Sequence, residues 1–116
     1  TRSGSLVITD APADNQGKGE AFSPTDLVCT ALSSCMVTTM GILANRENID
    51  IKGLQTEVLK IMGSAPRKIS EIQVTLSHPS LNVTEEQKQK LKNAALTCPV
   101  ALSLHDSVKQ TVIFNF

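Results

Sequence analysis

The sequence has 116 residues, enough for one domain with a buried core, and we expect a single domain over residues 1–116. Eleven basic and eleven acidic residues cancel, there is no Lys/Arg stripe, and the only aromatic residues are three phenylalanines, so nucleic-acid binding is not expected. Three irregularly spaced cysteines and no visible secretory signal favour a reducing, cytoplasmic setting.

The first element that the pattern predicts is a short strand, in which Leu6 and Ile8 alternate with polar neighbours. The chain begins at Thr1 without an initiator methionine, so we expect this N-terminal strand region to be truncated. A polar, Gly-rich and Asp-rich loop then covers residues 10–20.

A helix is predicted from Pro24 to Arg46. Ser23 is a suitable N-cap, Pro24 suits the first helical position, and Asp26 stands where a capping-box acid belongs. The nineteen residues that follow Asp26 carry no charge, which is about the length that crosses a bilayer. Because Ser, Thr and Gly interrupt this stretch, we expect a helix buried in protein and no membrane partner.

The rest of the chain predicts a sheet and two more helices. The expected elements are strands over Ile51–Met62 and Ile69–Ser77 joined by a turn at 63–66, a helix from the capping box at Thr84 to about Cys98, a short helix from Pro99, and a closing strand over 108–116. The predicted class is α+β, with an antiparallel sheet wrapped around one central, cysteine-bearing helix.

From the residues alone, two interpretations of the cysteines remain open. They are inert packing thiols, or they include a protected redox nucleophile with a second cysteine as its disulfide partner. Cys29 and Cys35 are about 9 Å apart along one helix axis and about 120° apart around it, so they cannot bridge each other. Cys98 is the one intrachain partner available to either. At an N-cap before Pro99, Cys98 is expected to have a lowered pKa and to be a good leaving group.

Metal binding is not expected. His78 and His105 lie in predicted turns, where solvated or capping roles are more usual, and the spacing of Cys98 and His105 matches no zinc motif.

Three stretches together resemble the OsmC/Ohr superfamily of peroxide-resistance proteins. They are Ala21-Phe22-Ser23-Pro24-Thr25-Asp26-Leu27, Ala31-Leu32-Ser33-Ser34-Cys35-Met36 and Ala94-Ala95-Leu96-Thr97-Cys98-Pro99-Val100, with Pro66-Arg67-Lys68-Ile69 between them. The resemblance implies an intertwined homodimer with active sites at the interface.

The same resemblance implies a thiol-dependent peroxidase that reduces organic hydroperoxides in oxidative and osmotic stress defence. Cys35 would be the peroxidatic residue and Cys98 the resolving residue, with a Cys35–Cys98 disulfide reduced by an external thiol or dithiol and no cofactor. Characterised peroxidases of the family place a glutamate where this chain has Thr25, and use an arginine from an N-terminal hairpin. Thr25, Asp26 and Arg2 are therefore the candidate supporting residues.

A different class of function is a non-enzymatic binding protein whose apolar interface pocket holds a small molecule or lipid. Under either function a second copy of the chain is the expected partner, because an uncharged helix of this length is more apolar than one small sheet can cover.

Overall fold

The computed structural model describes residues 1–116, and the helix α1, Pro24–Arg46, is its longest element. The predicted capping box is confirmed: the amide of Asp26 donates to Ser23 Oγ at 3.1 Å, and the amide of Ser23 donates to Asp26 Oδ2 at 3.0 Å. These bonds satisfy amides that the first turn of a helix leaves without intrahelical partners, so the start of α1 is set by local sequence.

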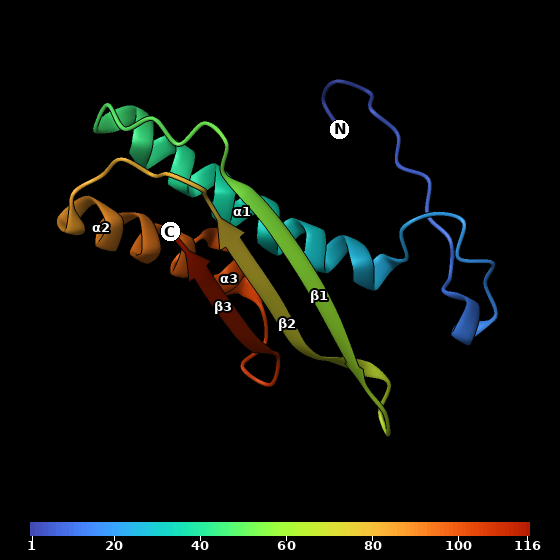
Figure 1. Cartoon of the computed structure of the whole chain (residues 1–116). Helices are drawn as coiled ribbons and strands as arrows, with labels where there is room; N and C mark the ends of the chain where they lie inside the picture. Colours follow the sequence, from blue (N-terminus) through green and yellow to red (C-terminus); the bar gives the residue numbers. More distant parts are fainter.

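The sheet has three strands in the order β1-β2-β3, which are Gln55–Gly63, Lys68–Ser77 and Lys109–Asn115 (Figure 1). β1 and β2 form the expected antiparallel hairpin. β3 pairs parallel with β2, so the prediction of an all-antiparallel sheet was wrong for this strand. The reason is the connection: helices α2, Glu85–Leu96, and α3, Pro99–Ser103, lie between β2 and β3 and form the long crossover that a parallel pair needs.

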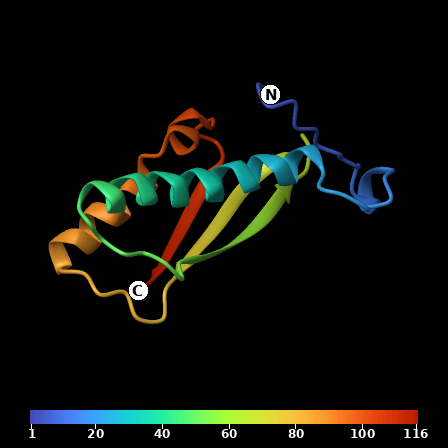
Figure 2. The same cartoon turned by 90° about the horizontal axis from the view of Figure 1, so that it is seen from above.

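The core lies between α1 and one face of the sheet. Ile72, Val74 and Leu76 alternate along β2 toward this face and are fully buried, and they join Leu32, Met36 and Met40 of α1 in one cluster. Helix α2 packs beside α1 and adds Leu91 and Ala95. In a view from above, α1 runs along this side of the sheet and no helix covers the opposite face (Figure 2).

The other side of α1 is open. Exposed residues recur along this side at helical spacing, among them Ala31, Ser34, Thr38, Ile42 and Asn45. Within one chain the sheet therefore covers one side of the helix and does not enclose it. By length and composition α1 is apolar enough to cross a membrane, a test that the core helix of a folded protein also passes.

The predicted N-terminal strand is absent. Leu6, Val7 and Ile8 are 93, 69 and 83% exposed, and no other strand of the chain lies alongside to accept their hydrogen bonds. Alternation predicts a strand only where a pairing partner exists, and this segment extends away from the rest of the chain (Figure 1).

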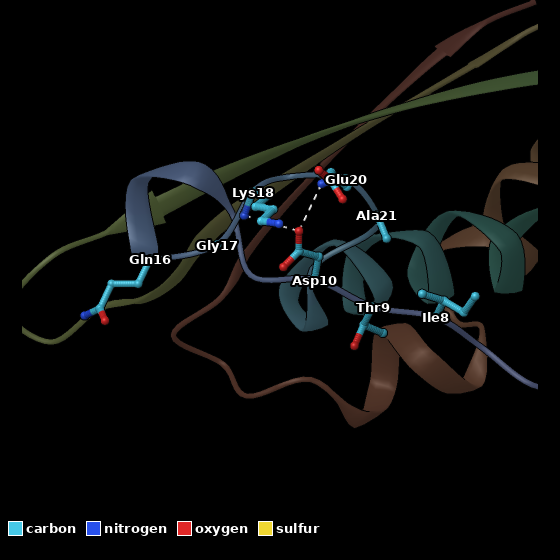
Figure 3. Close-up of a pocket in the computed structure, with 8 residues that line it drawn as sticks. All are labelled: Ile8, Thr9, Asp10, Gln16, Gly17, Lys18, Glu20 and Ala21. Carbon is cyan, nitrogen blue, oxygen red and sulfur yellow. Dashed lines mark hydrogen bonds between the residues drawn. The ribbon is translucent and has the colours of Figure 1, made fainter.

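The loop after this segment is ordered by one carboxylate. Asp10 Oδ2 accepts the amides of Lys18 and Glu20 at 3.2 and 3.1 Å, as Figure 3 shows. A Cβ at Gly17 would lie 1.7 Å from the carbonyl oxygen of Ala11, so the loop can close this tightly only with glycine there. The hollow that Figure 3 draws is lined by this loop and by Ile8 and Thr9 of the preceding segment, and it includes no cysteine.

Candidate functional site

The structure brings Cys35 and Cys98 together. Cys35 lies near the middle of α1 on the side toward α3, and Cys98 is the N-cap of α3, with Pro99 at the first helical position as predicted. The two thiols are neighbours, close enough for Cys35 to raise the pKa of Cys98, and both are free. Cys98 is completely buried, whereas Cys35 is only partly buried.

The prediction of a lowered pKa at Cys98 was wrong. Burial raises the pKa of the Cys98 thiol, the backbone amide of Ala101 lowers it, the neighbouring Cys35 raises it again, and the amide of Val100 lowers it more weakly. The net shift is upward because removing a thiolate from water outweighs the two amide dipoles. In the reduced protein Cys98 is therefore a protonated thiol at neutral pH.

Cys29 faces the sheet and stays apart from this pair. It is 2% exposed, and burial raises the pKa of its thiol, an effect that the charge of Lys60 opposes and that of Asp26 adds to. A buried thiol with a raised pKa is a poor nucleophile. The geometry of Cys29 is that of a packing residue.

Thr25 and Asp26 belong to a polar cluster at the start of α1 that also contains Lys60 of β1. Lys60 Nζ donates to Asp26 Oδ1 at 2.7 Å, to Thr25 Oγ1 at 2.9 Å and to Ser23 Oγ at 3.3 Å. The hydrogen bond from Lys60 is the main cause that holds the pKa of Asp26 below its usual value, with the Ser23 amide second. This cluster ties the first turn of α1 to the sheet.

Lys60 is the residue that sequence reasoning missed. It pairs with Ile72 in the register, so it stands on the helix-facing side of β1, where its side chain is 18% exposed. The alternation along the strand could have identified it. Alternate residues of a strand share one face, so Thr56, Val58 and Lys60 lie on the same side of β1, and that side faces the core. Cys35 is nine positions after Asp26, about 14 Å along the helix axis, so this cluster lies well away from the thiol pair.

Arg2 does not lie near the two thiols in this structure. It is exposed, forms no ion pair within the chain, and lies in the N-terminal segment that extends away from α1 (Figure 1).

The two histidines have local partners in turns. His78 Nε2 bonds to the carbonyl of Lys52 at 2.8 Å, and His105 Nδ1 bonds to Ser107 Oγ at 2.8 Å. Neither contact involves a cysteine.

Comparison with known proteins finds one family model, described as OsmC-like protein, which matches residues 17–112. No curated protein shows significant similarity to the chain.

Among solved structures, a Psychrobacter arcticus 273-4 protein named for osmotic stress induction and detoxification response is 47% identical, with a TM-score of 0.91 over 98% of this chain and 82% of that one. The organic hydroperoxide resistance protein OsmC of Legionella pneumophila is 16% identical, with a TM-score of 0.78 over 98% and 85%. The organic hydroperoxide resistance protein OhrB of Bacillus subtilis is 19% identical, with a TM-score of 0.59 over 82% and 71%. The resemblance predicted from the cysteine motifs is confirmed, and the latter two structures share the fold.

Proposed function

Because the chain belongs to the OsmC-like protein family, we propose that it is a thiol-dependent peroxidase that reduces organic hydroperoxides in oxidative and osmotic stress defence. The observation that carries the proposal is the pair of adjacent free thiols, Cys35 partly exposed and Cys98 buried beside it. The names of the similar proteins, which refer to organic hydroperoxide resistance and to osmotic stress and detoxification, support it.

The proposed reaction begins at Cys35. Its thiolate attacks the terminal peroxide oxygen, the O–O bond breaks, and the alcohol leaves after taking a proton, so the peroxide is reduced while Cys35 becomes a sulfenic acid. Cys98 then attacks Cys35 Sγ, water leaves, and a Cys35–Cys98 disulfide forms. An external thiol or dithiol supplies the two electrons that restore both thiols. We expect no metal or organic cofactor.

The burial of Cys98 suits the resolving role. A protonated, buried thiol does not compete with Cys35 for peroxide, yet it adjoins the sulfenic acid that it must trap. The proposed roles of Thr25 and Asp26 are indirect, because they hold the start of α1 together with Lys60 and do not touch the thiols. The role of Arg2 stays a prediction.

We further propose that the working form is a cytoplasmic homodimer with the thiol pair close to the subunit boundary. The open side of α1 and the exposed apolar residues Leu6, Val7 and Ile8 are the surfaces that a second copy would cover. A partner chain would also offer a route for a cation to approach Cys35.

The test compares three single variants in an assay of cumene hydroperoxide consumption with dithiothreitol. Cys35→Ser should abolish turnover. Cys98→Ser should reduce a first equivalent and then lose activity as Cys35 is oxidised to sulfinic acid, which mass spectrometry detects. Cys29→Ala is the matched control and should keep full turnover.

Full turnover in Cys35→Ser would disprove the mechanism. Thiols that stay inert to peroxide in a protein that carries a co-purified small molecule or lipid would favour the binding-protein alternative.

A further inference from the structure

The two sulfurs of the proposed disulfide are not equally accessible to a reductant. Cys98 is 0% exposed and belongs to the core cluster, whereas Cys35 packs against that cluster and keeps part of its surface in solvent. We infer that the reductant attacks only Cys35 Sγ, that a mixed disulfide on Cys35 is the intermediate, and that Cys98 is always the leaving thiolate. This inference rests on the proposed function and specifies its reductive half.

The direction of attack follows from displacement at sulfur. A thiolate must approach along the S–S axis, from the side opposite the leaving sulfur. Cys98 is a fully buried member of the core cluster, so a thiol could reach it along that axis only by displacing packed core side chains. A thiol attached to any carrier cannot take that path without local unfolding.

The approach to Cys35 is open by comparison. Cys35 is only partly buried, whereas Cys98 has no exposed surface. A thiol that comes from solvent therefore meets Cys35 before Cys98.

The surroundings of Cys98 act against the reverse step, in which its thiolate would displace the reductant from Cys35. Burial raises the pKa of the Cys98 thiol by more than the amides of Ala101 and Val100 lower it. Because burial favours the neutral form, the departing Cys98 sulfur takes up a proton. A protonated thiol attacks the mixed disulfide on Cys35 only slowly, so the reverse reaction is suppressed.

Reduction of the disulfide takes two thiol–disulfide exchanges. In the first, the reductant's thiolate forms a bond to Cys35 Sγ, the Cys35–Cys98 bond breaks, and its electron pair and one proton go to Cys98. In the second, another thiolate attacks the reductant's own sulfur in the mixed disulfide and releases Cys35 as thiolate. The reductant leaves as a disulfide, having supplied two electrons.

The experiment uses a Cys29→Ala background, because Cys29 and Cys35 share one tryptic peptide between Lys18 and Arg46, whereas Cys98 lies between Lys92 and Lys109. The disulfide is formed with diamide, so the test does not depend on peroxide turnover. Excess glutathione is added, samples are quenched in acid at early times, and mass spectrometry locates the glutathione adduct. The expected adduct is on Cys35, in excess over Cys98 by about tenfold or more.

Two further arms make the outcome decisive. In guanidinium chloride, where the fold no longer shields Cys98, adducts should form on both cysteines. In the native Cys29→Ala background, a lone Cys35 (with Cys98→Ser) should react with a disulfide reagent about tenfold or more faster than a lone Cys98 (with Cys35→Ser). Native adducts on Cys98, or on both residues equally, overturn the inference while leaving the peroxidase proposal intact. Failure of diamide to join Cys35 to Cys98 overturns both.

Discussion

At the scale of single residues, the three cysteines differ through their surroundings and not through their chemistry. Cys29 and Cys98 are both buried with raised pKa values, yet only Cys98 adjoins another thiol. Cys35 is the one cysteine that keeps solvent access, and it lies beside Cys98. The proposed roles of nucleophile, resolving thiol and packing residue follow from this difference in burial and neighbours.

Replacing Cys29 by alanine is expected to affect packing and not chemistry. Loss of one buried sulfur should lower the free energy of unfolding by about 1 kcal/mol, the order seen when a core side chain loses one heavy atom. Urea unfolding measures this loss, and peroxide turnover measured in parallel should be unchanged. A peroxide-induced crosslink between Cys29 and Cys98 in the parent protein would contradict the assignment.

The ion pair of Asp26 with Lys60 is expected to make stability depend on acid pH. Hydrogen bonding to Lys60 depresses the folded-state pKa of Asp26 from its ordinary value of 3.8, so the stabilisation is present above that value and is lost as the pH falls through the folded-state pKa. Asp26→Asn should therefore destabilise the protein near neutral pH, by about 1 kcal/mol after screening at this partly exposed site, and progressively less below about pH 4.

Urea unfolding of the parent and of Asp26→Asn at several pH values checks the sign. Lys60→Met is the matched variant, and a double-mutant cycle of the two should show a coupling energy that disappears in acid. A difference between parent and Asp26→Asn that grows as the pH falls would show that the carboxylate is not stabilised in the folded protein.

At the scale of elements, the helices begin where local signals place them. The α2 cap repeats the logic of α1: Thr84 Oγ1 accepts the amide of Gln87, and Gln87 Oε1 accepts the amide of Thr84, each at 3.1 Å. Helix α2 directly precedes Cys98 in the crossover. The stability of its first turn therefore helps to fix the position of Cys98 beside α1.

Thr84→Ala is therefore expected to lower the free energy of unfolding by about 1 kcal/mol, while Thr84→Ser, which keeps the hydroxyl, changes it little. Urea unfolding of the two variants checks the difference. Equal destabilisation by serine and alanine would mean that the methyl group, and not the cap, is what matters at this position.

At the scale of the whole molecule, the open side of α1 is the feature that a single chain leaves unexplained. Ile42 on this side is 55% exposed, and Ile113 on the uncovered face of the sheet is 44% exposed. The two isoleucines allow a matched test of which surface a second copy covers.

Light scattering at micromolar concentration is expected to give the mass of a dimer for the parent protein. Ile42→Asp should shift the mass toward that of a monomer and reduce turnover, because a charge on the proposed interface has no partner when buried. Ile113→Asp should leave both unchanged. A stable and active monomer of the parent protein would overturn the dimer proposal.

Much of the fold was readable from the sequence because its signals are local. Capping boxes at Ser23 and Thr84, proline at the start of α1 and α3, and strand alternation in β2 depend on neighbours only a few residues away. The motifs around Cys35 and Cys98 likewise identified the family before any contact was known.

What the tertiary structure alone decided involves partners distant in sequence. The parallel pairing of β3 and the absence of a strand at Leu6 and Ile8 depend on which strands lie alongside. The placement of Lys60 against Asp26 depends on the register of β1 beside α1. The raised pKa of Cys98 depends on how deeply the packed core removes it from water, which a local N-cap signal does not report.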